Sequence, residues 1–362
     1  MQLVSLQLKN FRCFEEVIFN FKSPIILIEG DNGSGKTSIL EALHYLGYLK
    51  SFRTHIAKEL IKIEKSSFFI KATFKDDLQT TEIQAGLAGK KRLVKINQKS
   101  ILSFKELLNS YRVITLTEED LDLVKLGPEN RRNFLDQYIL LTNASFLQTC
   151  KKYKQILDNR NKILQNQVFD QEVYLIWTKQ LWEQSQIIRD LRRTILQNIE
   201  IELNDLLNIY IDKNCLVNLK YEDKEGSWSS FDNFLNNKNN LLASEKYLGK
   251  SMFGSHLDDF HIYFKNKKSR AFASRGQQKL LVLLVKIAQI NILKKEGYQN
   301  IIFLLDDFIT DLDQKNISIL STALLSLKNQ LIFTCPISNG YLKELLVSKN
   351  AQIIQIDIND PK

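Results

Sequence analysis

Hydrophobic and polar residues follow two different periods in the first hundred positions. Residues 4–8 (VSLQL) and 17–21 (VIFNF) alternate with period two, which predicts half-buried antiparallel strands. Residues 25–29 (IILIE) form an apolar run, as in a strand covered on both faces, and residues 36–47 (KTSILEALHYLG) have helical spacing. Three more short strands are predicted, at residues 68–74, 81–87 and 92–98.

Helical patterns replace strand patterns from residue 127 onward. Pro128 stands just inside a predicted helix start, and amphipathic stretches follow at 152–165 and 177–207, the second roughly 45 Å long at 1.5 Å per residue. Polar sequence around 223–241 precedes a return to strand, helix and strand. We therefore expect an α/β head formed by residues 1–128 and 250–362, with an inserted helical lobe at residues 129–249.

Composition and charge limit the classes of protein to which the chain can belong. The 362 residues suffice for a large core, and only 13 glycines and 4 prolines interrupt them. The 4 cysteines are scattered without a Cys-x-x-Cys pair, and no apolar run has the length of a membrane helix, so we expect a cytoplasmic protein. The net charge of +9 fits a nucleic-acid partner, although an abundance of lysine in the overall composition explains it equally well.

The loop between the predicted strand and helix carries a candidate chemistry. Gly30-x-x-x-x-Gly35-Lys36-Thr37 has the spacing and the strand–loop–helix context of a phosphate-binding P-loop. Backbone N–H groups of residues 33–37 would surround a β-phosphate, Lys36 would reach the β- and γ-phosphates, and Thr37 would bind Mg²⁺. The alternative is a Gly-rich turn without a ligand. The expected nucleotide-binding residues are Gly30, Asn32, Gly33, Ser34, Gly35, Lys36, Thr37 and Ser38.

A second apolar run, residues 301–308 (IIFLLDDF), reaches two carboxylates near its end. Asp306 stands where a Walker B acid would hold Mg²⁺, directly or through water. Asp307 follows at the strand tip, where it would orient or deprotonate the attacking water. Lys36 and Asp307 are therefore the predicted catalytic residues, and the alternative is that both aspartates are solvated loop residues.

Ser274 and Gln277 form an S-x-x-Q capping box before a long apolar helix. A capped helix start also exposes N–H groups that can bind an anion. Because the P-loop already has its own helix, a second phosphate-facing helix suggests that ATP lies between two copies of the chain.

Longer segments then resemble known proteins. Ser274-Arg275-Gly276-Gln277 resembles the signature motif of ABC-type ATPases, and Asp311 and Asp313 stand in the positions of their D-loop. Over nearly its whole length the chain resembles the RecF family of bacterial recombination mediators. The resemblance rests on ordered matches at LKNFRCF, GDNGSGKTSILEALHYL, KSFRT, LGPENRRNFLD, YKQILDNRNKIL, GSHLDDF and SRGQQKLLVLLVKIAQ.

This resemblance implies an ABC-type ATPase head, as in Rad50 and SMC proteins, with an inserted helical lobe. It implies ATP and Mg²⁺ as ligands and an ATP-dependent homodimer, whose nucleotide site includes the signature and D-loop residues. It implies weak, slow, DNA-stimulated hydrolysis that releases the dimer. It also implies binding to double-stranded and gapped DNA at junctions, where such proteins act with RecO and RecR to load RecA on gaps coated by single-strand binding protein.

Some positions depart from the family pattern or have no assigned role. Glu118 and Ser255 stand where the family often has proline. His256 and Asp259 are residues of the kinds that bind metal ions, but two ligands at this spacing are too few to define a metal site. We favour a structural or nucleotide-sensing role for His256. Thr334 occupies the switch region where transporter ATPases carry histidine, and no glutamine is identified as the Q-loop.

Basic clusters are the candidate DNA contacts, at residues 89–95 and 265–270 and at Arg192 with Arg193. Each cluster alone is also compatible with a solvated surface. For Arg131 and Arg132, a structural pairing that ties the lobes together is an equal alternative to a DNA contact. Without a base-reading motif, we expect recognition of duplex shape and backbone.

Three other classes of protein remain as alternatives. An SMC- or Rad50-type ATPase needs far longer coiled-coil arms, and an ATPase-coupled nuclease needs a further catalytic domain. A transporter subunit is disfavoured by the S-R-G-Q motif and by the helical insertion.

Overall fold

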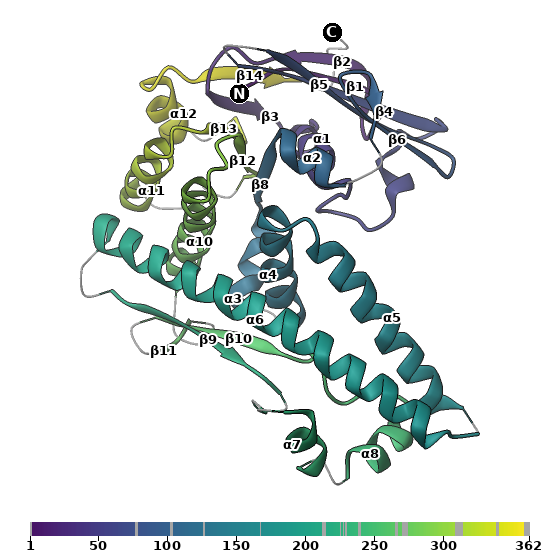
Figure 1. Cartoon of the computed structure of the whole chain (residues 1–362). Coiled ribbons are helices and arrows are strands. Elements are labelled where there is room, and N and C mark those ends of the chain that lie inside the picture. The colour runs from purple at the N-terminus through teal and green to yellow at the C-terminus, as the bar shows by residue number, and fades with distance from the viewer. Residues whose placement is uncertain are drawn as a thin grey trace. The chain divides into compact units, whose positions relative to one another are not determined.

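A computed structural model of the chain divides into two compact units (Figure 1). Unit 1 comprises Met1–Leu121 and Arg275–Lys362, and unit 2 comprises Asp122–Ser274. The structure describes residues 2–76, 79–101, 104–125, 127–166, 168–211, 215–224, 226, 228, 230–237, 240–264, 267–269, 274–307, 314–337 and 340–357.

Unit 1 is built on a parallel sheet. Its strands lie in the order β14 (Gln352–Ile356), β3 (Ile25–Gly30), β13 (Gln330–Cys335), β12 (Ile301–Leu305) and β8 (Arg112–Leu116). The strands predicted in the apolar runs at 25–29 and 301–308 are confirmed as β3 and β12, although β12 ends at Leu305, and β8 was not assigned from the sequence. Because all these strands are parallel, their carboxyl ends meet at one edge, which is where ligands bind in such sheets.

An antiparallel sheet forms the other layer of unit 1. Its strands lie in the order β2 (Phe14–Asn20), β1 (Gln2–Phe11), β4 (Ser67–Lys75), β5 (Thr80–Ala88), β6 (Lys91–Ile96) and β7 (Lys99–Ser100). The period-two stretches predicted in the first hundred residues are confirmed as strands of this sheet.

Helix α1 (Lys36–Tyr48) joins the two sheets in one core. Its apolar side chains, including Ile39, Leu43 and Leu46, belong to a buried cluster that also contains Leu6 of the antiparallel sheet and Leu304 of the parallel sheet. Burial on most sides explains why α1 lacks a strongly polar face. The other helical segments of unit 1 are η1 (Ala57–Leu60), α2 (Phe104–Ser110), η2 (Glu118–Leu121), α10 (Arg275–Lys295), α11 (Gln314–Ser326) and α12 (Gly340–Val347).

Unit 2 consists of long helices beside a small sheet. The helices are α3 (Asp122–Lys125), α4 (Pro128–Thr142), α5 (Phe146–Gln165), α6 (Gln171–Tyr210), α7 (Phe231–Asn236) and α8 (Leu241–Leu248), and the strands are β9 (Val217–Glu222), β10 (Asp259–Phe264) and β11 (Lys267–Lys268). The predicted helices are confirmed. Helix α6 has 40 residues, or about 60 Å at 1.5 Å per residue, so it is longer than the sequence pattern predicted.

The boundaries of the two units differ from those expected. The chain leaves unit 1 after residue 121 rather than 128, and it returns at 275 rather than 250. The later return has a clear cause, because β10 pairs with β9 along its length and therefore belongs with unit 2. Among the described residues, no helix is both long and apolar enough to cross a membrane.

Candidate nucleotide site

The predicted P-loop connects the end of β3 to the start of α1. Gly33 and Gly35 have φ angles of +85° and +101°, which L side chains rarely adopt. A Cβ at Gly35 would also lie 2.7 Å from both Cys13 Sγ and Phe14 Cζ. The loop therefore needs glycine at position 35 for its backbone angle and for the space.

Lys36 and the first turn of α1 supply the positive groups of the loop. The buried Lys36 ammonium donates hydrogen bonds of 2.9 Å to the carbonyl oxygens of Gly30 and Asp31, so it lies inside the loop. Backbone N–H groups in the first turn of a helix have no acceptor within the helix. Ser34 and Ser38 are buried beside them, whereas Asn32 is exposed. This arrangement can hold an anion at the positive end of α1.

The two candidate magnesium ligands lie together although 269 positions separate them. Thr37 Oγ1 donates a hydrogen bond of 2.9 Å to Asp306 Oδ1. Burial is the main cause that raises the pKa of Asp306, and the adjacent Asp307 raises it further, whereas the threonine hydroxyls and the Arg53 guanidinium lower it. Hydroxyl and carboxylate oxygens are ligands that Mg²⁺ prefers.

Thr334 is a site residue that the sequence pattern left without a definite role. Its hydroxyl donates to Asp306 Oδ1 at 2.9 Å and accepts from the Asp307 backbone N–H at 2.9 Å. Asp307 has a φ of +47°, an uncommon backbone conformation for a residue other than glycine. Thr334 thus fixes both aspartates at the edge where β12 and β13 end.

Arg53 is a further residue whose place the sequence did not reveal. The KSFRT segment marked it only as a family match, yet its charge reaches Asp306 and its Nη1 lies 4.0 Å from Glu41 Oε2. Glu41 is buried in α1 and also accepts two hydrogen bonds, of 2.7 and 2.6 Å, from Arg12.

The predicted signature motif lies at the exposed start of α10. Ser274 directly precedes the helix, so the predicted start is confirmed, and Arg275, Gly276 and Gln277 form its first turn. Asp311 and Asp313, the predicted D-loop residues, lie outside the described residues.

His256 and Asp259 bind other side chains of unit 2. His256 Nδ1 lies 2.7 Å from the Tyr153 hydroxyl, and Asp259 accepts bonds of 2.7 and 2.9 Å from Arg131. Within the described residues, no group of three or more His, Cys, Asp or Glu side chains could hold a metal ion. A structural role for His256 and for Arg131 therefore fits the geometry.

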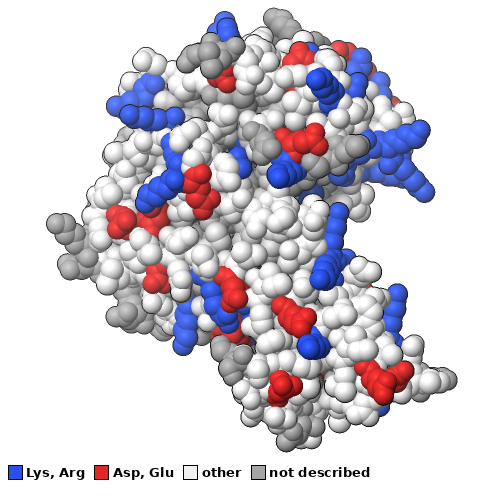
Figure 2. Space-filling model, viewed as in Figure 1, with Lys and Arg blue, Asp and Glu red and all other residues white. Residues whose placement is uncertain are grey.

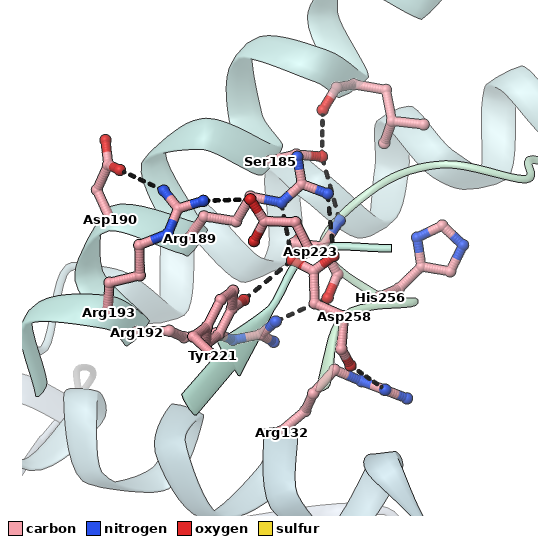
Figure 3. A network of polar contacts seen from close by, with 12 residues as sticks. Arg132, Ser185, Arg189, Asp190, Arg192, Arg193, Tyr221, Asp223, His256 and Asp258 are labelled. Carbon is pink, nitrogen blue, oxygen red and sulfur yellow. Dashed lines mark hydrogen bonds and ion pairs between the residues drawn. The ribbon is translucent and has the colours of Figure 1, made fainter. Parts of the chain in front are cut away.

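Two arginines predicted to contact DNA have partners inside unit 2. Arg192 is 5 % exposed and donates two bonds of 2.8 Å to Asp136, so the prediction that it contacts DNA is wrong. Arg193 pairs with Asp223 and with Asp190. Figure 3 shows both arginines on α6 with Arg189, whose guanidinium donates bonds of 2.8 and 3.0 Å to the buried Asp258.

Comparison with known proteins decides the family. A family model described as the RecF/RecN/SMC N terminal domain matches residues 2–356. The DNA replication and repair protein RecF of Natranaerobius thermophilus is 34 % identical over 330 residues, which cover 86 % of this chain and 86 % of that protein. The chain belongs to the RecF family. A RecF from Clostridioides difficile is 27 % identical over 99 % of this chain and 98 % of its own.

Solved structures support the fold of this RecF family member. A structure titled "recombination mediator protein RecF-ATP in RecFOR pathway" has a TM-score of 0.83 and 24 % identity, covering 94 % of this chain and 93 % of that one. An Smc head bound to the C-winged helix domain of ScpA has a TM-score of 0.57 and 15 % identity, covering 100 % and 95 %. The predicted ABC-type ATPase head of the Rad50/SMC kind is confirmed.

Proposed function

We propose that this chain is an ATP-dependent DNA-binding protein of recombinational repair and replication-fork maintenance. ATP joins two copies into a dimer that binds duplex DNA at single-strand/double-strand junctions. With RecO and RecR, the dimer assists RecA loading on gaps coated by single-strand binding protein. Slow, DNA-stimulated hydrolysis of ATP then releases the dimer, so the nucleotide acts as a timer.

The observation that carries this proposal is the convergence of Thr37, Thr334 and Asp306 beside the P-loop. Each threonine hydroxyl lies 2.9 Å from the same oxygen, Asp306 Oδ1. With Lys36 in the adjacent loop, the site has a cation for phosphates and oxygen ligands for Mg²⁺. Bound Mg²⁺ would neutralise charge between the β- and γ-phosphates, and Thr37 and Asp306 would hold it.

Asp307 is the proposed general base for hydrolysis. Its backbone is held by Thr334 next to the proposed magnesium site. A carboxylate there can orient the attacking water, while Lys36 stabilises charge on the phosphates. One copy alone lacks the second anion-binding helix, so hydrolysis in a single copy would be slower still than in the dimer.

The exposure of the signature motif supports the proposed dimer. Ser274, Arg275 and Gln277 are exposed at the N-terminal end of α10, where N–H groups can bind a phosphate. A second copy would place this end against the nucleotide in the P-loop, with Gly276 allowing close approach. Asp311 and Asp313 would then complete the shared site.

The proposed DNA surface lies on unit 1. Figure 2 shows Lys and Arg side chains gathered beside the ends of the antiparallel strands. The β5–β6 turn carries exposed Lys90, and exposed Lys91 and Arg92 follow at the start of β6. Gly89 of this turn lines one groove together with Lys58, Lys62, Lys65 and the acidic Glu64. Two basic segments therefore meet on one surface, although Glu15 partly neutralises Lys62 and Lys65. Such a surface binds phosphates without reading bases.

The test is the molar mass in solution, measured by light scattering with and without ATP–Mg²⁺. We expect the wild-type mass to double with ATP and Ser274→Arg to stay monomeric while still binding ATP. Ser348→Arg, which changes an exposed serine near the end of α12, is the matched control and should dimerise. Gapped duplex DNA should stabilise the wild-type dimer. A wild-type monomer under all these conditions would exclude the clamp.

A further inference from the structure

Three basic residues of α10 form one stripe facing the η2 turn. Arg275, Lys279 and Lys286 are spaced by four and seven positions, which a helix with 3.6 residues per turn places on one side. Lys286 Nζ lies 2.6 Å from Asp120 Oδ1. Lys279 Nζ donates to Glu118 Oε1, and Arg275 Nη2 lies 3.7 Å from Glu118 Oε2. Glu118 thus contacts two of the three cations.

The two contacts of Glu118 differ in burial. The Lys279 side chain is 1 % exposed, whereas that of Arg275 is 65 % exposed. The Glu118 side chain is 43 % exposed, so its pair with Lys279 is shielded from water on the lysine side only, yet it is screened less than the pair with Arg275. Glu118 therefore holds the first turns of α10 mainly through Lys279, and it holds the signature arginine only loosely.

The position of Glu118 in the chain links it to the rest of the site. Asp306 donates its backbone N–H to the Leu116 carbonyl at 2.8 Å, two residues before Glu118. Glu118 also lies just before the chain leaves unit 1 at Leu121, and its partner Arg275 stands where the chain returns. Glu118 is therefore close in sequence to the residue that contacts Asp306, and its carboxylate contacts the first turns of α10. These residues also lie near the two positions where the chain passes between unit 1 and unit 2.

We propose that Glu118 is a positioning residue for the signature motif. Through Lys279 its carboxylate fixes the first turns of α10, and it keeps the Arg275 guanidinium poised to turn toward the γ-phosphate bound by a second copy. The last part of this inference rests on the proposed ATP-dependent dimer. The first part concerns one copy alone.

Hydrogen exchange without nucleotide tests the first part. In Glu118→Gln, amides of residues 279–283, which donate within α10, should exchange about tenfold faster than in the wild type, because the hydrogen bond from Lys279 loses its charged acceptor. The matched control is Glu82→Gln, which removes a 2.8 Å ion pair with Lys71 on the antiparallel sheet and should leave these amides unchanged. Unchanged exchange in Glu118→Gln would overturn the proposal.

ATP titration of the dimer tests the second part. Glu118→Gln should need about fivefold more ATP for half-maximal dimerisation, while ATP binding by each copy, measured in the Ser274→Arg background, stays the same. The double variant Glu118→Lys/Lys279→Glu exchanges the two charges. Its ATP concentration for half-maximal dimerisation should lie closer to the wild-type value than that of either single variant. A merely structural role would lower the melting temperature without moving the ATP midpoint, and that result contradicts the proposal. If the wild type never dimerises, the proposed function fails, but hydrogen exchange in the single copy still decides whether Glu118 positions the start of α10.

Discussion

The hydroxyl of Thr334 donates a 2.9 Å hydrogen bond to Asp306 Oδ1 from the neighbouring strand. β12 and β13 are parallel, and the Leu305–Phe333 pair ends their ladder, so the next residues of both strands meet at the same edge. Because the hydroxyl also accepts the Asp307 N–H, one side chain sets the positions of the proposed metal ligand and the proposed base.

Replacing Thr334 with valine should slow ATP turnover by about 10- to 100-fold, because hydrogen bonds to charged groups contribute about 1.5–3 kcal/mol. The measurement is single-turnover hydrolysis, with ATP binding recorded separately and expected to persist. Thr334→Ser keeps the hydroxyl and should retain most of the rate. Equal rates for the valine and serine variants would show that the hydroxyl does not act on this site.

Replacing Gly35 with alanine should weaken ATP binding by at least about tenfold. The change adds a left-handed backbone strain of about 1–2 kcal/mol and places a Cβ 2.7 Å from Cys13 Sγ. Equilibrium binding of a fluorescent ATP analogue measures the effect. Gly127→Ala is the control, because Gly127 has a φ of −77° and nothing within 4 Å of its added Cβ, and normal binding by both variants would contradict the argument.

Replacing Asp258 with asparagine should destabilise unit 2 by about 3–5 kcal/mol, since it removes one charge of a buried ion pair with Arg189. All three tryptophans (177, 182 and 228) lie in unit 2, so urea unfolding followed by tryptophan fluorescence reports on this unit. Asp190→Asn removes a 74 % exposed partner of Arg193 and should change stability by at most about 1 kcal/mol. Equal losses of unfolding free energy in Asp258→Asn and Asp190→Asn would contradict the special importance of the buried pair.

The stability of unit 2 should fall in mild acid because of His256. Burial, with the charge of Arg132, lowers the pKa of His256 from 6.5 to about 4. The unfolded chain therefore binds more protons below pH 6.5, so the stability contributed by neutral His256 is complete above that pH and is lost as the pH falls toward 4. At pH 5 the loss is about 2 kcal/mol.

Urea unfolding at pH 7 and pH 5 measures this dependence. His256→Gln should remove it, whereas His261→Gln, a change on the neighbouring strand β10, should keep it. The same loss of stability in acid for His256→Gln and wild type would assign the dependence to other groups.

Replacing Lys90 and Lys91 together with alanine should weaken binding to duplex DNA. Each phosphate that a lysine neutralises contributes about 0.9 to the slope of log K against log salt, so the double variant should have a slope smaller by up to about 1.8. The control removes the same charge from elsewhere on unit 1, by changing the exposed Lys22 and Lys349 to alanine. An unchanged slope in the Lys90/Lys91 variant would move the DNA surface away from the β5–β6 turn.

The sequence by itself determined those features that depend on local spacing. The glycine pattern at 30–35 and the flanking apolar runs predict a P-loop between a strand and a helix, and β3 and α1 have these positions. Period-two alternation likewise predicted the antiparallel strands, because successive side chains on a strand face opposite sides. The family followed from the order of longer motifs.

Only the tertiary structure decided which distant residues share a site or an ion pair. The order β3-β13-β12 brings Thr37, Thr334 and Asp306 together, and no local pattern encodes the order of strands in a sheet. Basic residues likewise look alike in a sequence, although Arg192 is buried against Asp136 while Lys91 is exposed. The roles of such side chains depend on partners supplied by other elements, and those partners are set by packing over the whole unit.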